Sequence, residues 1–202
     1  VGLCIGTRPD CVGDDILDFL AKQAKDFLIW LEYGLQSAHD RTLRRIRRGH
    51  TVAELLATLE RTRQRHLPVC VHVILGVPGE DRADMLATAR FLAALDIQAV
   101  KIHLLYVVRG TPLEELYRAG TYRCLERDEY AAIAAEFLAL LPPHLVIQRL
   151  TGDPHREALV APAWALDTTR NLQAIHDYMI RHALKQGSAF VPPLREAAAP
   201  QA

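Results

Sequence analysis

The sequence predicts an α/β protein built on a parallel sheet, and two observations indicate this class. Near-continuous apolar runs, rich in β-branched and aromatic residues, recur along the chain as they do in strands buried on both faces. Segments with apolar residues three and four positions apart, the spacing of a helix face, lie between these runs. Strands that alternate with helices favour a parallel sheet, either open or curled into a barrel.

The predicted elements follow one another in strand–helix order. Five runs are predicted to be strands, at residues 1–6, 27–34, 69–76, 99–107 and 144–150. Helices are predicted at residues 14–26, 51–66, 82–96 and 128–141, with another near 168–185. Thr51 and Glu54 fit a capping box at one helix start. Thr111 followed by Pro112 predicts a second start, because proline suits the first helical position.

The same pattern divides the chain into three parts. Residues 1–143 are expected to form the barrel part of the fold. Residues 144–187 are expected to add a strand and a helix that cover one end of the sheet. The last stretch, "FVPPLREAAAPQA", lacks a core pattern, so residues 188–202 are expected to form a disordered tail.

Composition and charge exclude several classes of protein. Lys plus Arg and Asp plus Glu number 24 each, so the chain lacks the positive excess of a dedicated nucleic-acid binder. No apolar run approaches the roughly 20 residues that cross a bilayer, and no signal-like segment is present, which predicts a cytoplasmic protein. Cys4, Cys11, Cys70 and Cys124 form no C-x-x-C pair. We therefore expect small buried cysteines rather than a zinc ribbon or disulfides.

Polar residues follow the first two predicted strands, at the edge where parallel sheets place their chemistry. Thr7, Arg8 and Asp10 lie in "GTRPD", where they either face a ligand or form a loop in which Arg8 pairs with Asp10. Glu32 lies within an apolar strand, so it must face a polar interior or meet an arginine. Gln36 offers a donor and an acceptor, which suits the amino and carboxylate groups of an amino-acid ligand or a ribose.

An arginine-rich segment, "RTLRRIRRGH", comes next. At helical spacing Arg41, Arg44, Arg45 and Arg48 share one face, which is typical of a solvated surface, with an RNA-contacting patch as the alternative. Arg48 differs, because Gly49 breaks the helix and can turn this arginine back toward the strand ends. A guanidinium there could hold a carboxylate through two parallel hydrogen bonds.

The third and fourth predicted strands carry titratable side chains. His72 is interpreted either as a satisfied core histidine or as a ligand residue. The loop "GVPGE", which contains Gly76 and Pro78, lacks the G-x-G-x-x-G spacing of dinucleotide-binding folds. Lys101 and His103 share a strand face two residues apart, which indicates a polar interior and favours acid–base chemistry.

Taken together, these segments resemble the radical S-adenosylmethionine (radical SAM) superfamily, in its YhcC-type branch related to the core of the Elp3 family. The resemblance rests on "GTRPDCV", "LEYGLQSAHDRTLRRIRRGH", "VHVILGVPGED", "KIHLLYVVRGTPL" and "RLTGDPHREALVAPAW", and it covers roughly residues 1–187. It implies a partial (β/α)6 barrel in which a [4Fe-4S] cluster binds and reduces S-adenosylmethionine. The products are methionine and a 5′-deoxyadenosyl radical that abstracts hydrogen from a substrate. A flavodoxin- or ferredoxin-type reductant is implied as well.

The resemblance also implies roles for individual residues. Gln36 and Arg48 would help to hold S-adenosylmethionine. His72 would lie near its ribose, and the loop with Gly76 and Pro78 would pass its adenine. For two further groups of residues the resemblance implies only a position at the active face of the sheet, without a defined role. One group is the candidate catalytic residues Lys101, His103 and Glu32. The other is the active-face loop with Thr7, Arg8 and Asp10.

One part of the family pattern is missing. The superfamily binds its cluster through a C-x3-C-x2-C loop or a wider variant, and this chain has no such triplet, so no metal site is expected in it. The first strand resembles the family's third, so the chain is expected to hold family strands 3 to 6 plus a C-terminal extension. We therefore expect a C-terminal portion of a longer protein, with the cluster only in the full-length parent and no activity in this chain alone.

Two other functions are compatible with the same residues. A non-catalytic RNA-binding or scaffold module would use the helix that contains Arg41 to Arg48. A lyase- or aldolase-type barrel would use Lys101 as a Schiff-base nucleophile. The sequence does not assign a substrate, although relatedness to the Elp3 core makes RNA a candidate.

Overall fold

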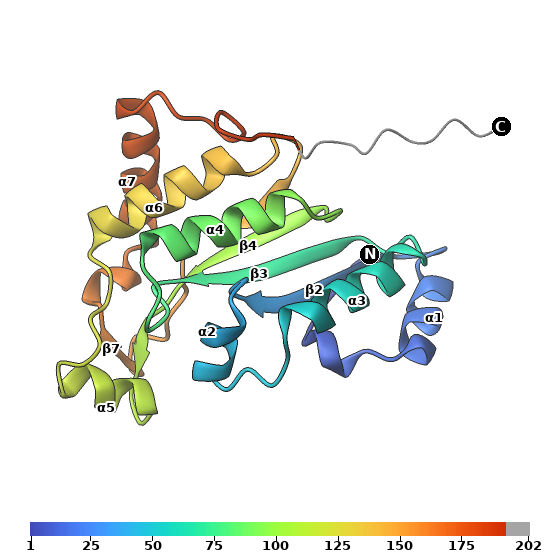
Figure 1. Ribbon diagram of the computed structural model, residues 1–202, viewed down its shortest axis with the longest axis horizontal. Coiled ribbons are helices and arrows are strands. Elements are labelled where there is room, and N and C mark those ends of the chain that lie inside the picture. The colour runs from blue at the N-terminus through green and yellow to red at the C-terminus, as the bar shows by residue number, and fades with distance from the viewer. Residues whose placement is uncertain (193–202) are drawn as a thin grey trace.

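The computed structural model describes residues 1–192 and contains a sheet of five strands (Figure 1). Their order across the sheet is β1 (Gly2–Thr7), β2 (Leu28–Gln36), β3 (Val69–Leu75), β4 (Ala99–Leu104) and β6 (Val146–Arg149). Every neighbouring pair in this sheet is parallel. β1 and β6 form its two edges, so the sheet is open rather than closed into a barrel. The predicted α/β class with a parallel, incomplete barrel is confirmed.

The predicted strand at residues 99–107 is too long. β4 ends at Leu104, and β5 (Val107–Val108) pairs antiparallel with β7 (Leu159–Ala161) in a separate two-stranded sheet. The apolar run therefore continues through a bend between two sheets. A pattern of hydrophobic residues does not reveal such a bend, because both strands are buried.

Helices alternate with the strands as predicted. The longer ones are α1 (Asp14–Gln23), α3 (Val52–Arg63), α4 (Arg82–Ala93), α6 (Arg127–Leu140) and α7 (Thr168–Arg181). The shorter ones are η1 (Pro9–Cys11), α2 (Asp40–Arg45), α5 (Pro112–Arg118) and η2 (Ala163–Leu166). Thr51 and Glu54 form the predicted capping box of α3. Thr111 caps α5, with proline in its first turn, so both predicted helix starts are confirmed.

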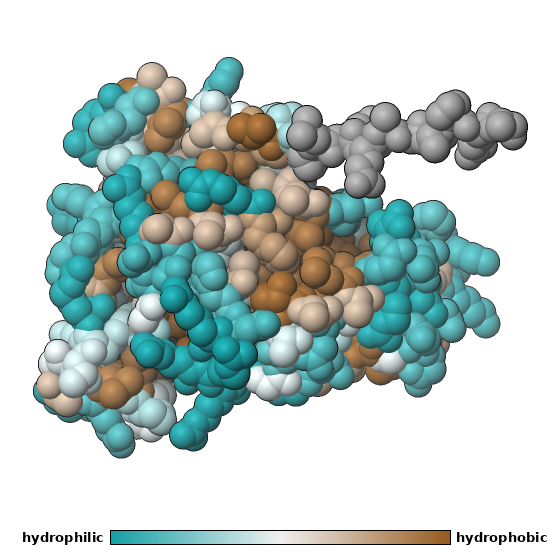
Figure 2. Space-filling model, in the orientation of Figure 1, coloured by the Kyte–Doolittle hydropathy of each residue, from teal (hydrophilic) through white to brown (hydrophobic). Residues whose placement is uncertain are grey.

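The sheet has two unlike faces. Along β2, Ile29, Leu31, Tyr33 and Leu35 join a hydrophobic core with side chains from α1, α3, α4 and α6. Because side chains alternate along a strand, Glu32 points to the opposite face. Figure 1 shows α3 and α4 in front of the strands, and Figure 2 shows hydrophobic side chains gathered in the seam between these helices. The helices therefore cover the apolar face, and the other face of the central strands is free to carry polar groups.

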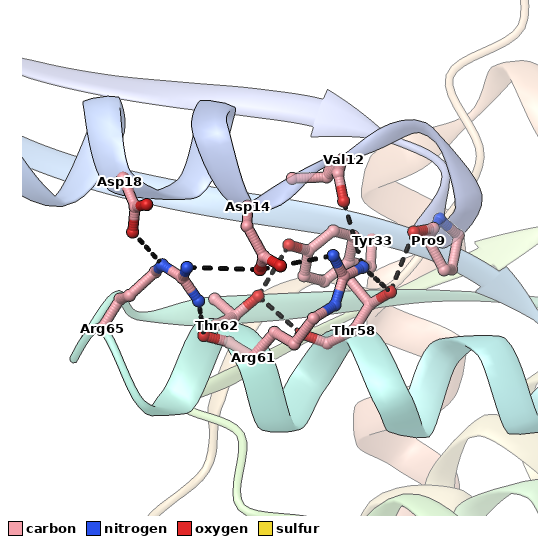
Figure 3. A network of polar contacts seen from close by, with 9 residues as sticks. All are labelled: Pro9, Val12, Asp14, Asp18, Tyr33, Thr58, Arg61, Thr62 and Arg65. Carbon is pink, nitrogen blue, oxygen red and sulfur yellow. Dashed lines mark hydrogen bonds and ion pairs between the residues drawn. The ribbon is translucent and has the colours of Figure 1, made fainter.

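A polar network fastens α3 to β2 and to the loop after β1 (Figure 3). The Tyr33 hydroxyl lies 2.9 Å from Thr62 Oγ1, which donates to the Thr58 carbonyl at 2.8 Å. Thr58 Oγ1 in turn donates to the Pro9 carbonyl at 2.9 Å. The remaining members of the network are Val12, Asp14, Asp18, Arg61 and Arg65. The network fixes where the chain runs at the carboxyl end of β1.

The C-terminal extension joins the same sheet and core. β6 pairs with β4, and α7 packs against α6. After α7, the N–H of Ala189 donates to the Ala139 carbonyl at 2.8 Å. The boundaries at residues 143 and 187 stay a prediction, and residues 193–202 of the predicted tail lie outside the described part. No helix within residues 1–192 is both long and apolar enough to span a bilayer.

Replacing Tyr33 with Phe should lower the free energy of unfolding by about 1 kcal/mol, because the Thr62 hydroxyl loses a buried hydrogen-bond partner while the ring packing is kept. Urea unfolding followed by circular dichroism measures the difference. Tyr117→Phe, on an exposed tyrosine of α5, is the matched control and should change stability by less than about 0.5 kcal/mol. Equal stability of Tyr33→Phe and wild type would contradict a stabilising role for the network.

Candidate functional site

Glu32 is the centre of a charge network on the polar face of the sheet. Its carboxylate oxygens accept from Lys101 Nζ at 2.6 and 2.5 Å, and Oε2 lies 2.9 Å from His72 Nε2. The strand registers pair Gly34 with His72 and His72 with Lys101, so β2, β3 and β4 direct these side chains to one face. Sequence reasoning expected a polar interior or an arginine beside Glu32. The partners are a lysine and a histidine.

The network keeps Glu32 ionised. Burial alone would raise the pKa of this carboxyl, but the hydrogen bonds and charge of Lys101, with a smaller effect of His72, lower the pKa below its ordinary value. Burial lowers the pKa of His72 although the Glu32 carboxylate opposes this, so the His72 imidazole is neutral at pH 7. At that pH the network therefore contains one carboxylate, one ammonium and one neutral imidazole.

His103 extends the polar face beyond this network. It follows Lys101 by two residues on β4, and its ring centroid lies 5.2 Å from that of His72. Its Nε2 atom is buried and has no hydrogen-bond partner among the described residues. Burial lowers the pKa of His103 to about 4, and the positive charges around it act in the same direction. His103 is therefore a neutral imidazole with unused hydrogen-bonding capacity.

A second cluster forms where β2 ends. Arg48 Nε and Nη2 donate to the Gly34 carbonyl at 3.3 and 3.2 Å. A Cβ atom at Gly34 would overlap Arg48 Nη2 and the Gln36 amide nitrogen. The side chains of Arg48 and Gln36 therefore occupy the space that a side chain at position 34 would need. The prediction that Gly49 breaks this helix is wrong, because α2 ends at Arg45 and the chain turns at Arg47, which has a φ of 52°, before Gly49, which has a φ of 81°. We call Gly34, Gln36 and Arg48 the Gly34 cradle.

The loop after β1 distinguishes the two interpretations of Arg8 and Asp10. Arg8 Nε and Nη2 donate to the Asp10 carboxylate at 3.0 and 2.5 Å, so the two residues pair with each other. This hydrogen bonding lowers the pKa of Asp10. Thr7 Oγ1 donates to the Arg8 carbonyl at 3.4 Å. The Arg8 guanidinium lies 3.3 Å from where a Cβ of Gly49 would stand, which places the loop beside the Gly34 cradle.

The loop after β3 reaches the same end of the sheet. Gly76 has a φ of 90°, and its carbonyl accepts from the Tyr122 hydroxyl at 2.9 Å. Pro78 is half-buried. Ser37, which follows the cradle residue Gln36, donates to the Glu80 carboxylate. These contacts connect the loop both to the end of β2 and to the segment after α5.

The arginines of α2 lie on the surface, as predicted. Arg41 Nη2 lies 2.5 Å from the Asp84 carboxylate. Three further arginines are exposed and form no ion pair within residues 1–192: Arg44, Arg45 and Arg47. A Cβ at Gly79 would overlap the Arg45 guanidinium, so this arginine lies over the loop after β3. The unpaired charges are therefore close to the carboxyl ends of the strands, where α2 begins (Figure 1).

The cysteines differ in part from the prediction. Cys70 and Cys124 are buried, but Cys4 and Cys11 are exposed. Cys4 lies on the edge strand β1 and Cys11 ends η1, and neither place is covered by the core. Within residues 1–192, no three His, Cys, Asp or Glu side chains are arranged so that they could hold a metal ion.

Sequence reasoning missed three residues of this region. Gly34 has no side chain to attract notice, and only its neighbours show its importance. Arg149 pairs in register with Lys101. It is a charged residue inside the apolar run at residues 144–150, and a charged residue inside an apolar run is also what drew attention to Glu32. His50 is buried, and burial together with the charge of Arg48 lowers its pKa. Its position two residues after Arg48 could have indicated it.

Two protein-family models match the chain. The radical SAM superfamily model matches residues 1–92, and the radical SAM C-terminal domain model matches residues 97–181. An uncharacterized protein of Methanocaldococcus jannaschii is 41% identical over 94% of this chain and 60% of its own length. Protein YhcC of Escherichia coli K12 is 38% identical over 96% of this chain and 62% of its own. The chain thus spans about three fifths of these curated relatives.

More distant similarities point in the same direction. A tRNA uridine(34) acetyltransferase of Methanocaldococcus jannaschii is 26% identical over 92% of this chain and 34% of its own length. The solved structure of Methanocaldococcus infernus Elp3, with an N-terminal deletion, superposes with a TM-score of 0.79 at 21% identity, over 92% of this chain and 43% of that one. The last comparison shows a shared fold.

Replacing Glu32 with Gln should destabilise the protein by about 2–3 kcal/mol, because the largely buried Lys101 ammonium loses its counter-charge. Adding Lys101→Met should recover part of this loss, since it removes the unpaired charge. Urea unfolding of the wild type, both single variants and the double variant gives the coupling energy. Glu60→Gln, in an exposed ion pair with Arg63, is the control and should leave the stability nearly unchanged.

The cost of Glu32→Gln should also depend on pH. The folded-state pKa of Glu32 is lowered, so its contribution is present above the unfolded-state pKa and is lost as the pH falls through the folded-state pKa. Repeating the urea series between neutral and strongly acidic pH should show the difference between wild type and variant shrinking. A difference that stays constant over this range would contradict the ionised network.

Proposed function

The chain belongs to the radical SAM superfamily, and from that premise we propose that it is part of an enzyme that binds S-adenosylmethionine and carries out radical chemistry. When bound to a reduced [4Fe-4S] cluster, S-adenosylmethionine supplies a 5′-deoxyadenosyl radical that abstracts hydrogen from a substrate. The chain spans about three fifths of the length of its curated relatives. The activity is therefore proposed for a whole protein of that kind, and not for this chain alone.

The Gly34 cradle is the observation that carries this proposal. It offers a guanidinium and an amide with both donor and acceptor, and the missing Cβ of Gly34 leaves the room in which these two side chains lie over the strand end. These groups fit the carboxylate, amino and ribose groups of S-adenosylmethionine. His72 pairs in register with Gly34, and Gly76 and Pro78 follow β3, so the five proposed cofactor-binding residues come from β2, β3 and the segments that follow these two strands.

The described residues do not fit an iron–sulfur cluster. Such clusters are held by cysteine thiolates, and no suitable group of side chains occurs within residues 1–192. The cluster and the flavodoxin- or ferredoxin-type reductant therefore enter the proposal through the family alone. We assign no residue of this chain to them.

The residues of the polar face would act on the substrate side. Glu32 uses its oxygens on Lys101 and His72, so we propose that it positions these side chains rather than accepting a proton itself. Lys101 and His103 are left to face the substrate. The same ion pair counts against the aldolase alternative, because a lysine held as an ammonium beside a carboxylate is a poor Schiff-base nucleophile.

We further propose RNA as the substrate class. A relative that covers most of this chain is a tRNA uridine(34) acetyltransferase. Arg44, Arg45 and Arg47 are exposed, and no carboxylate within residues 1–192 pairs with them, so they can contact phosphates. Arg45 lies over Gly79, in the loop after β3 that reaches the same end of the sheet as the Gly34 cradle. RNA contact next to a cofactor site favours an enzyme acting on RNA over a non-catalytic scaffold.

Gly34→Ala and Arg48→Met should each weaken S-adenosylmethionine binding at least about tenfold. The first puts a Cβ where Arg48 Nη2 and the Gln36 amide nitrogen lie and so displaces both side chains, and the second removes charge-assisted hydrogen bonds. Isothermal titration calorimetry on the 202-residue chain measures the dissociation constants. Arg44→Met, an exposed arginine of α2, four residues before Arg48, is the control and should bind like wild type. Binding unaffected by both cradle variants would remove the cradle from the proposal.

Arg44→Gln together with Arg45→Gln should weaken binding to a tRNA transcript and flatten its salt dependence. Two lost phosphate contacts should reduce the slope of log K against log salt by roughly 1.4–1.8. Filter binding between about 50 and 200 mM salt measures this slope. Arg41→Gln is the control, because this arginine is already paired with Asp84. Equal slopes for the double variant and wild type would exclude contacts through α2.

A further inference from the structure

We propose that Asp84 and Thr88 of α4 are positioning residues of the Gly34 cradle, because they hold the segment that joins two of its side chains. This segment is residues 37–47, which we call the α2 arm; Gln36 precedes it and Arg48 follows it. The inference rests on the proposed function in one respect, namely that the cradle binds S-adenosylmethionine. It goes beyond it by assigning part of the cofactor affinity to another helix, outside the cradle.

The first argument is that the α2 arm directs both side chains. Gln36 ends β2 with a φ of 74°, a conformation that costs free energy in a residue other than glycine, so the chain that follows must hold it there. At the other end of the arm, the Arg48 N–H donates to the Leu43 carbonyl of α2 at 2.9 Å, and Arg47 turns the chain with a φ of 52°. A shift of α2 would therefore move both Gln36 and Arg48.

The second argument is that α4 holds the arm through three directed contacts. The Ala38 N–H donates to Thr88 Oγ1 at 3.2 Å, and His39 Nε2 donates to the Asp84 carbonyl at 2.9 Å. Arg41 Nη2 lies 2.5 Å from the Asp84 carboxylate. Residues 84 and 88 are about one helical turn apart, so these contacts lie along one side of α4. The first half of the arm is thus fastened to a helix that is itself packed against the core.

The third argument is that apolar packing alone does not fix the arm. Leu43 of α2 is buried, but hydrophobic contacts are non-directional and permit small shifts and rotations, whereas hydrogen bonds require defined distances and angles. Two further contacts, of Ser37 with Glu80 and of Asp40 with the Val52 N–H, hold the arm from outside α4. Loss of the α4 contacts should therefore displace the arm slightly rather than release it. The contacts within the cradle are local in sequence, and α4 fixes the geometry in which they are held.

Asp84 also takes part in the capping box of α4, which supplies a matched control. Asp81 Oδ1 accepts from the Asp84 N–H at 2.9 Å, and Asp84 Oδ2 accepts from the Asp81 N–H at 3.2 Å. Within residues 1–192, Asp81 forms no hydrogen bond or ion pair with the α2 arm. Asp81→Ala therefore damages the start of α4 as Asp84→Ala does, but it leaves every contact of the arm in place.

The test compares Asp84→Ala, Thr88→Val and the double variant in two measurements on the whole 202-residue chain. Isothermal titration calorimetry gives the dissociation constant for S-adenosylmethionine. Each single variant should raise this constant about threefold and the double variant about tenfold, because the lost contacts are individually modest. Without any ligand, nuclear magnetic resonance gives the hydrogen-exchange rate of Arg48 Nε–H, which donates to the Gly34 carbonyl. This rate should rise severalfold in the double variant.

Asp84→Glu and Thr88→Ser keep the carboxylate and the hydroxyl, so they should restore both measurements toward wild type. Asp81→Ala should change neither, and backbone amide spectra verify that each variant is folded. An unchanged dissociation constant or an unchanged Arg48 exchange rate in the double variant would overturn the proposal, and so would equal effects of Asp81→Ala and Asp84→Ala. Failure of the wild type to bind S-adenosylmethionine would refute the proposed function. The exchange rates, which need no ligand, would then decide the positioning role alone.

Discussion

The structure depends on one constraint, which is that a carboxylate lies inside β2, an inner strand of the sheet. Glu32 is 6% exposed, and an unpaired charge so deeply placed would cost several kcal/mol. Its compensation comes from His72 and Lys101 on the next two strands. A slip of one residue between these strands would turn the partners toward the helices, so the charge network also fixes the strand register.

This constraint explains why the two faces of the sheet differ. One face is packed by helices and carries only apolar side chains of the central strands, which makes it a rigid support. The other presents Glu32, His72, Lys101 and His103 from three strands, and the Gly34 cradle lies at the carboxyl end of the first of them. Side chains held by a strand and by a neighbouring charge have little freedom, and such preorganisation favours both binding and catalysis.

Sequence reasoning recovered the elements better than the contacts. Helix starts such as Thr51 were predictable because capping depends on residues a few positions apart. The return of Arg48 to the strand end was predicted, but its cause was not, since α2 ends at Arg45 and the chain turns at Arg47 before Gly49 is reached. The pairing of Glu32 with Lys101 was not, because strand register determines it and the sequence leaves register open. Lys101 was grouped with His103, its neighbour on the strand, but its ionic partner lies two strands away. The length of the fourth strand was overestimated because an apolar pattern continues through the bend between β4 and β5.

The Gly34 cradle has a consequence for the order in which the chain folds. Arg48 reaches Gly34 across 14 positions of sequence, whereas Lys101 reaches Glu32 across 69. Closing the longer loop costs about 1.4 kcal/mol more in chain entropy. The cradle can therefore form from one strand–helix segment while the sheet is incomplete, and the charge network follows only when three strands have assembled. In this chain the part that would grip a cofactor is local, and the part that would face a substrate is the product of the finished fold.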